Sequence, residues 1–235
     1  MGLTLKQVVP WGRSLADYRQ MFALTDQDLA ASILDCAGGP SSFNAEATAQ
    51  GTSVISCDPI YQFSVEEIQQ RIQDTYPQII AALEDNGDRF VWHQFRSPHH
   101  LGEVRLATMD CFLEDFPQGR AQGRYQTQML PELPFETSQF NLALCGHLLF
   151  SYSQQLNLDF HLNAIRELAR VAQEVRIFPI VTNFAGDISP HLSPILEQLP
   201  QAGYHLTVET VPYEFQRGGN EMLRVFPPNY HQSPP

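Results

Sequence analysis

Apolar residues fall into two kinds of pattern along this chain, and these patterns predict its elements. Short runs that are apolar on both faces predict buried strands, because a parallel sheet covered on both sides shows no polar alternation. We expect seven strands, over residues 32–36, 52–57, 123–128, 140–145, 174–181, 204–211 and 221–226.

Apolar residues at helical spacing predict helices between these strands. Ser14, Thr25 and Ser64 each precede an acid by three residues, which is the capping-box signature of a helix start. Pro77 should kink or break the helix that begins after Ser64. Pro117 should end the helix expected over residues 109–116. Further helices are expected over residues 43–50, 109–116, 158–172 and 190–202.

The order of these elements predicts an α/β fold, a three-layer α/β/α sandwich around a mostly parallel sheet. Only a loop joins the last two strands, so the last strand should be antiparallel. The connection between the second and third strands is far longer than an ordinary crossover, which suggests a lid. We expect one domain over 1–226, with N-terminal helices at 14–30, a helical lid-like insertion at about 62–120, a loosely structured start at 1–12 and a disordered tail at 227–235.

A strand, a small-residue turn, a helix and a second strand follow one another over residues 32–61. The first strand carries Asp35 and runs into Ala37–Ser42, and the second strand ends in Asp58. Glycines in such a turn let the backbone approach a ligand closely, and the next helix directs free N–H groups at the same place. Asp58 stands near the spacing at which a carboxylate accepts both ribose hydroxyls. This unit predicts a nucleotide-sized ligand site at the carboxyl edge of the sheet.

Charge and composition exclude several classes of partner. The 235 residues carry 14 basic and 26 acidic side chains, a net charge of −12, which argues against nucleic acid or an anionic membrane as a partner. No apolar run reaches the ~18–20 residues of a membrane span, and the start of the chain has no signal pattern. We therefore expect a cytoplasmic protein, and the oligomeric state stays open.

The four cysteines are widely spaced and form no CxxC motif, which favours buried structural thiols over a metal site. Three of them, Cys36, Cys57 and Cys145, stand at predicted strand ends.

From about residue 14 to 226 the chain resembles the class I S-adenosylmethionine-dependent methyltransferases. The stretch Ile33–Phe43 (I-L-D-C-A-G-G-P-S-S-F) is similar to the first motif of that family, and Asp58 falls where the family places its ribose-binding acid. Leu133–Phe135 and Ser138–Cys145 are similar to the segment that leads into the family's fourth strand. The resemblance implies a Rossmann-like methyltransferase fold, S-adenosylmethionine as cofactor, and cofactor contacts from Arg13, Tyr18, Asp35, Ala37, Gly38, Gly39, Pro40, Ser41, Asp58, Pro59, Ile60, Met129, Leu130, Cys145 and Gly146.

The chain departs from the family's pattern at several places. Ala37 and Ser41 replace two glycines of the turn, and Asn141 replaces an acid of the fourth strand. Met129 and Leu130 stand where an acid often pairs with the adenine amino group, so apolar contacts and backbone groups should hold the adenine. A nicotinamide dinucleotide is the competing ligand, but its G-x-G-x-x-G phosphate cradle is incomplete here.

His147, directly after the fourth strand, is the candidate general base, because its ordinary pKa suits proton abstraction. Tyr152, Trp92, Tyr61, His99 and His100 are candidates for the acceptor pocket. Cys145–Leu148 is unlike the Asn/Asp-Pro-Pro-Tyr/Phe sequence used for amino groups of DNA bases, and no acidic cluster suits Mg²⁺. We therefore expect a methyltransferase for a small-molecule or lipid-like acceptor. The alternatives are a non-catalytic S-adenosylmethionine-binding sensor or assembly protein, and a dehydrogenase.

Overall fold

A computed structural model describes residues 9–183 and 186–228, and its central feature is a sheet of seven strands. The order across the sheet is β3-β2-β1-β4-β5-β7-β6, and β7 alone is antiparallel to its neighbours. This confirms the predicted fold class. The strands are β1 (Ser32–Cys36), β2 (Ser53–Cys57), β3 (Tyr125–Gln126), β4 (Phe140–Gly146), β5 (Ala172–Phe178), β6 (His205–Thr210) and β7 (Glu221–Phe226).

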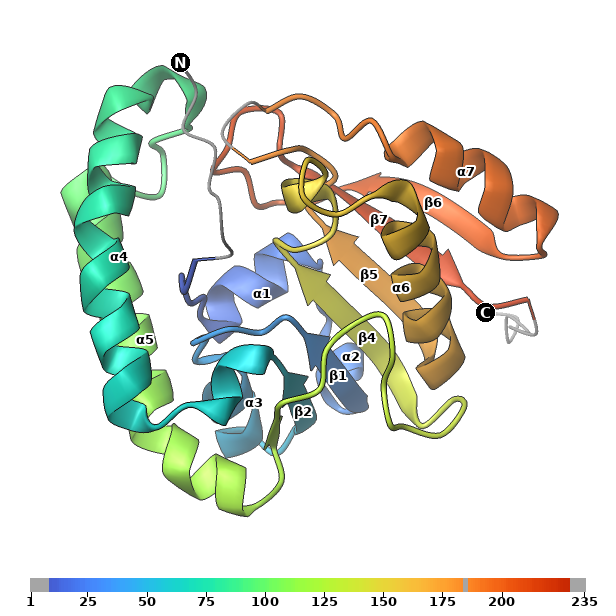
Figure 1. Cartoon of the computed structure of the whole chain (residues 1–235), viewed down its shortest axis with the longest axis horizontal. Coiled ribbons are helices and arrows are strands. Elements are labelled where there is room, and N and C mark those ends of the chain that lie inside the picture. Colours follow the sequence, from blue (N-terminus) through green and yellow to red (C-terminus); the bar gives the residue numbers. More distant parts are fainter. Residues whose placement is uncertain (1–8, 184–185, 229–235) are drawn as a thin grey trace.

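Helices cover both faces of the sheet and give the three layers of Figure 1. One face packs on α6 (Leu158–Val171) and α7 (Leu192–Gln201). The other packs on α1 (Leu15–Met21), α2 (Asp26–Leu29) and α3 (Phe43–Ala49). The capping boxes expected at Ser14, Thr25 and Ser64 are all present.

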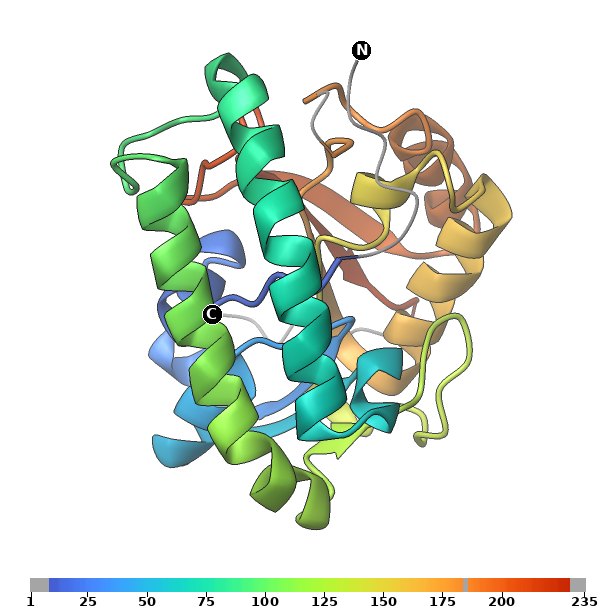
Figure 2. The same ribbon diagram turned by 60° about the vertical axis from the view of Figure 1, so that its left-hand side comes forward.

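The long connection between β2 and β3 folds into two helices, α4 (Val65–Asp85) and α5 (Pro98–Ala121). They lie side by side at the β3 edge of the sheet and rise beyond it (Figures 1 and 2). Three short 3₁₀ turns, η1 (Pro59–Gln62), η2 (Gly87–Arg89) and η3 (Phe150–Tyr152), complete the chain. A lid role for this pair stays a prediction.

The expectation that Pro117 ends its helix is wrong, because Pro117 lies inside α5, which continues to Ala121. Pro77 lies inside α4 without breaking it, and a kink there stays a prediction. An interior proline costs about 3 kcal/mol in an isolated helix. Here the neighbouring residues pack in the core: Ile72 and Ile79 are buried on the two sides of Pro77, and Phe116, before Pro117, packs against Tyr61 and Tyr125. This tertiary packing outweighs the local cost.

The first described residues are better ordered than expected. Trp11 packs against Tyr76, and the N–H of Val9 donates to Tyr152 Oη. The prediction of a loose start is therefore wrong for residues 9–12, while residues 1–8 lie outside the described part. Most of the predicted tail, residues 229–235, lies outside it too.

Three cysteines meet across the sheet at one level. Cys36 of β1 is in register with Cys57 of β2 and with Cys145 of β4, and all three face the α6 side. This places the strand-end thiols on neighbouring strands, as the family's strand order implies. All four cysteines of the chain are free.

No helix of the described residues is long and apolar enough to cross a membrane.

Candidate functional site

The carboxyl ends of β1, β2 and β4 border a cavity of about 620 Å³. Four connections after strands line it, through residues 37–41, 58–60, 128–130 and 146–148. Its other walls include the N-terminal segment, α1, α4, the turn after β4 through Tyr152, the end of β5 through Phe178, and the loop between β6 and β7. The volume lies within the ~300–1,000 Å³ of small-molecule sites, and the place is the ligand edge of an open α/β sheet.

Asp35 supports the turn from below. Its buried carboxylate accepts hydrogen bonds from Tyr18 Oη and Ser56 Oγ, both at 2.9 Å. Burial raises the pKa of Asp35 to about 7, against the lowering effect of these hydrogen bonds, and the nearby charge of Asp58 raises it further. Asp35 does not line the cavity, so it acts on a ligand through the turn that it holds.

The turn leaves its backbone open to the cavity. Gly39 has a φ of +57°, and a Cβ added there would meet nothing within 4 Å. Ala37, at the place of the family's first glycine, also lies in the left-handed region, with φ +60°. The Ser41 hydroxyl donates to the Gly38 carbonyl at 2.6 Å and accepts from the Arg13 N–H at 3.0 Å. Ser41 therefore ties the turn to the N-terminal segment, which a glycine in its place could not do.

Replacing Gly38 with alanine is expected to lower the free energy of unfolding by about 1–3 kcal/mol. A Cβ at this position would lie 2.3 Å from Asp35 Oδ2 and 2.9 Å from Tyr61 Oη, so the buried carboxylate would have to move. Urea unfolding measures the loss. Gly87→Ala is the matched control, because a Cβ there meets nothing within 4 Å. Equal stability of the two variants would contradict this packing argument.

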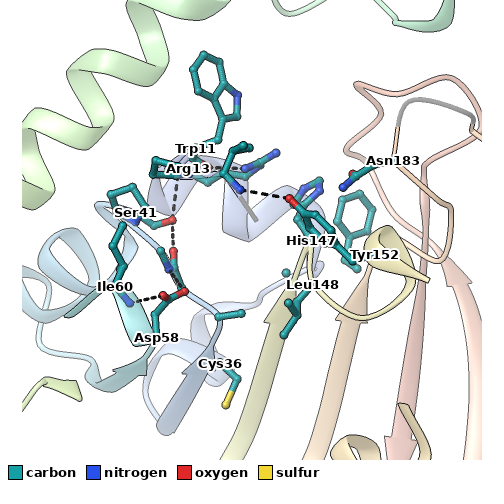
Figure 3. A pocket seen from close by; sticks show the side chains of 18 of the residues that line it. Trp11, Arg13, Cys36, Ser41, Asp58, Ile60, His147, Leu148, Tyr152 and Asn183 are labelled. Atoms are coloured by element: carbon teal, nitrogen blue, oxygen red, sulfur yellow. Dashed lines mark hydrogen bonds between the residues drawn. The ribbon is translucent and has the colours of Figure 1, made fainter. Parts of the chain in front are cut away.

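Asp58 holds the other side of the turn. Its Oδ2 accepts from the Gly39 N–H at 3.0 Å and its Oδ1 accepts from the Ile60 N–H at 2.8 Å (Figure 3). Burial raises the pKa of Asp58, against the lowering effect of these two amides. One N–H on each oxygen leaves a second lone pair on each, so the carboxylate keeps capacity for two further donors.

Two arginines interact on the side of the N-terminal segment: Arg13 lines the cavity and Arg105 does not. The buried Arg105 guanidinium pairs with Asp17 at 2.5 Å and donates to Tyr213 Oη at 3.0 Å. Arg13 donates through Nη1 to the Trp11 carbonyl at 2.7 Å, and its buried Nε has no hydrogen-bond partner within residues 9–183 and 186–228. Burial, and then the charge of Arg105, lower the pKa of Arg13.

His147 lies beside these arginines with a φ of +53°, and its buried Nε2 has no partner among the described residues. Burial, followed by the charges of Arg13 and Arg105, holds its pKa well below the usual value. The expectation of an ordinary histidine pKa is therefore wrong. The imidazole is neutral and weakly basic, and its role as general base stays a prediction.

Most of the residues singled out in the sequence come together here. Arg13, Tyr18, Ala37, Gly38, Gly39, Pro40, Ser41, Asp58, Pro59, Ile60, Met129, Leu130, Gly146, His147 and Tyr152 all line the cavity. Asp35, Cys145, Tyr61, Trp92, His99 and His100 do not.

Of the residues expected at the acceptor, Tyr61 and Trp92 form their contacts outside the cavity. Tyr61 is buried and donates to the Gly39 carbonyl at 2.8 Å, so it supports the turn from outside the cavity. Trp92 donates to the Gly87 carbonyl at 2.9 Å and packs its ring against Phe90 and Phe215.

Several residues that line the cavity gave no signal in the sequence. Val9 and Trp11 stand in a stretch without periodicity, and Phe215 stands in the last loop. Gln128 precedes Met129, and its buried Oε1 has no hydrogen-bond partner among the described residues. A buried amide oxygen can accept a hydrogen bond from an amino group, so Gln128 offers the cavity a free acceptor.

Within the described ranges, no three His, Cys, Asp or Glu side chains are placed to hold a metal ion.

The strand order and the single antiparallel strand define the Rossmann-like methyltransferase fold. Among solved structures, the chain is similar to magnesium protoporphyrin IX methyltransferase from Synechocystis PCC 6803 with bound S-adenosylmethionine, at 15% identity and a TM-score of 0.44, over 86% of this chain and 72% of the other. It is also similar to the mitomycin 7-O-methyltransferase MmcR, at 11% identity and a TM-score of 0.46, over 90% of this chain and 53% of the other. At these values the likenesses support no conclusion about activity or substrate.

The chain belongs to the family of the uncharacterized protein MJ0045 of Methanocaldococcus jannaschii. The two are 35% identical over 226 residues, which cover 95% of this chain and 98% of the relative. No protein-family model matches the chain.

Proposed function

We propose that this chain is an S-adenosylmethionine-dependent methyltransferase that acts on a small-molecule acceptor. The observation that carries the proposal is the pairing of Gly39 and Asp58 across the turn, at 3.0 Å, with both residues facing one cavity. The open backbone at Gly39 admits a ligand, and the remaining lone pairs of Asp58 suit two ribose hydroxyls.

The residues around this pair fit the other parts of the cofactor. Ile60, Met129 and Leu130 offer apolar contacts for the adenine, with Gln128 Oε1 as acceptor for its amino group. Tyr18 lines the cavity on the other side of the turn, where the methionine moiety would lie. The turn lacks the third glycine of a pyrophosphate cradle, which favours this cofactor over a dinucleotide.

When bound, S-adenosylmethionine supplies a methyl group on a sulfonium, which is already a strong electrophile. The protein then has to orient the acceptor and exclude water, and orientation alone can contribute ~7–11 kcal/mol to the rate. The buried walls of the cavity perform both tasks. A general base is needed only for an acceptor that arrives protonated, and His147 is the candidate for that role.

S-adenosylhomocysteine at 100 times its Kd is expected to stabilise the protein by ~2.7 kcal/mol. For a chain of this size the melting temperature should rise by roughly 5–10 °C. Differential scanning fluorimetry measures the shift, and NAD at equal concentration is the control. A shift with NAD alone, or with neither ligand, would overturn the proposed cofactor.

Binding alone would also suit a non-catalytic sensor. Incubation with S-adenosylmethionine and a panel of acceptors tests turnover, with formation of S-adenosylhomocysteine as the readout. A shift with the cofactor and no product from a broad panel would favour the sensor.

A further inference from the structure

Beyond the turn, the cavity continues as an apolar chamber along α4. Thr75, Ile79 and Leu83 line it from one face of that helix, and the rise of 1.5 Å per residue spreads them over about 12 Å. The exposed Arg71 and Asp74 line it nearer the start of α4, where the Arg71 guanidinium lies over the Phe63 ring. Aromatic rings contribute to the other walls. Phe90 and Phe215 are stacked with centroids 4.8 Å apart, and Trp11 lines the cavity from the N-terminal segment. Such walls suit a flat, apolar molecule.

One end of this chamber carries the guanidinium of Arg13, and the carboxylate that acts on it, Asp17, is already paired with Arg105. Arg105 is matched by Asp17, whereas Arg13 forms no ion pair within residues 9–183 and 186–228. Figure 3 shows the Arg13 side chain extending from the Ser41 side of the turn toward His147. The Nε of Arg13 and the Nε2 of His147 are both buried and without a hydrogen-bond partner among the described residues.

The carboxylates that line the cavity, Asp58 and Asp74, do not neutralise the charge of Arg13. Asp58 is turned to the amides of Gly39 and Ile60, and Asp74 stands on an exposed position of α4. The Nε of Arg13 and the Nε2 of His147 thus lie beside the positive charge of the guanidinium. A bound oxyanion would accept hydrogen bonds from both nitrogens and neutralise this charge. The neutral His147 can then donate through Nε2–H, which adds a second hydrogen bond to the same oxyanion.

We propose that the methyl acceptor is an organic anion with an aromatic body, a carboxylate or an acidic phenol, whose oxygen is bound by Arg13 and His147 while its rings fill the chamber between α4 and Phe215. The proposal rests on the proposed function, since it names the substrate class of that site. In this arrangement the Arg13 guanidinium binds the acceptor and not the methionine carboxylate of the cofactor. An acceptor that arrives ionised has no proton to lose, so the weak basicity of His147 is no obstacle.

Three probes with the same ring system and similar size test the charge requirement: 2-naphthoate, 2-naphthalenemethanol and 2-naphthylmethylamine. Each is titrated calorimetrically into the full-length protein saturated with S-adenosylhomocysteine. The naphthoate should bind roughly 10- to 100-fold more tightly than the alcohol, because a hydrogen bond to a charged group is stronger than a neutral one, and the amine should bind most weakly.

Two variants test separately how the oxyanion of the acceptor is bound and how its aromatic rings are bound. Arg13→Gln should weaken naphthoate binding roughly 10- to 100-fold and leave the alcohol within about threefold, with Arg166→Gln, an exposed arginine outside the cavity, as the control. Phe215→Ala should weaken the acid and the alcohol alike, because it removes a wall that both touch.

The melting shift with S-adenosylhomocysteine is measured for each variant. Loss of that shift in Arg13→Gln with naphthoate binding retained would assign the guanidinium to the cofactor and overturn the proposal. So would equal affinities for the three probes, or binding of none of them. Absence of the shift in the wild-type protein would instead remove the proposed function itself, so the two failures are distinguishable.

Discussion

Asp58→Ala is expected to weaken the binding of S-adenosylhomocysteine at least about 100-fold. A hydrogen bond to a charged group contributes ~1.5–3 kcal/mol, and the carboxylate has lone pairs for two ribose hydroxyls. The substitution also removes the acceptor of the Gly39 N–H, which is bound at 3.0 Å, and so loosens the turn that the ligand contacts. Isothermal titration calorimetry measures the affinity.

Stability and affinity have to be measured separately for this variant, because Asp58 also accepts from the Ile60 N–H at 2.8 Å. Urea unfolding without ligand measures how much the substitution lowers the free energy of unfolding, and this loss should be about 1–3 kcal/mol. Asp85→Ala, at an exposed position of α4, controls for the loss of one negative charge. An Asp58→Ala protein that stays folded and keeps its affinity within threefold would exclude the ribose role.

Asp35→Asn is expected to change how stability depends on pH. Burial raises the pKa of Asp35 from 3.8 to about 7, so between these values the folded protein holds a proton that the unfolded chain has released. The free energy of unfolding of the wild type should therefore fall as pH rises from about 4 to about 7 and level off above. The fall from this one group amounts to roughly 4 kcal/mol at most. An amide cannot ionise, so the variant should lack this decline and exceed the wild type in stability at pH 8.

Urea unfolding at several pH values between 4 and 8 gives the difference between variant and wild type, in which the other titrating groups largely cancel. Asp85→Asn, with an exposed carboxyl, should follow the wild type across the range. A constant difference between Asp35→Asn and the wild type would show that folding does not raise the pKa of Asp35.

The elements that build the site were largely visible in the sequence. A fully apolar run such as residues 140–145 has few alternatives to a buried strand, and the capping boxes at Ser14 and Ser64 marked helix starts to the residue. Asp35 and Asp58 could be placed at one sheet edge because parallel strands joined by a helix end on the same side. Their different tasks could not be predicted, because the burial of Asp35 depends on Tyr18 and Ser56.

The features that could not be predicted from the sequence depend on contacts between segments that lie far apart in the chain. Nothing near Trp11 in the chain shows that Tyr76 will lie against it. The low pKa of His147 arises from burial and from Arg13 and Arg105, which lie far from it in the sequence. Pro117 remains inside α5 because the residues around it pack in the core. Local propensity therefore predicted the strands better than the long helices or the walls of the cavity.

The row of thiols across β2, β1 and β4 has a practical consequence for spectroscopy. Burial raises the pKa of Cys57 and of Cys145 to about 12, and that of Cys36 rises strongly as well, so all three stay protonated and unreactive at neutral pH. Cys111, partly exposed on α5, is the one remaining thiol of the chain. Burial and the neighbouring Glu46, Glu114 and Asp115 raise the pKa of Cys111 as well, but its partial exposure makes it the thiol that a maleimide dye should reach in the unmodified protein. The wild-type chain thus carries a labelling position on α5, and fluorescence from that position would follow any movement of the α4–α5 pair when a ligand binds.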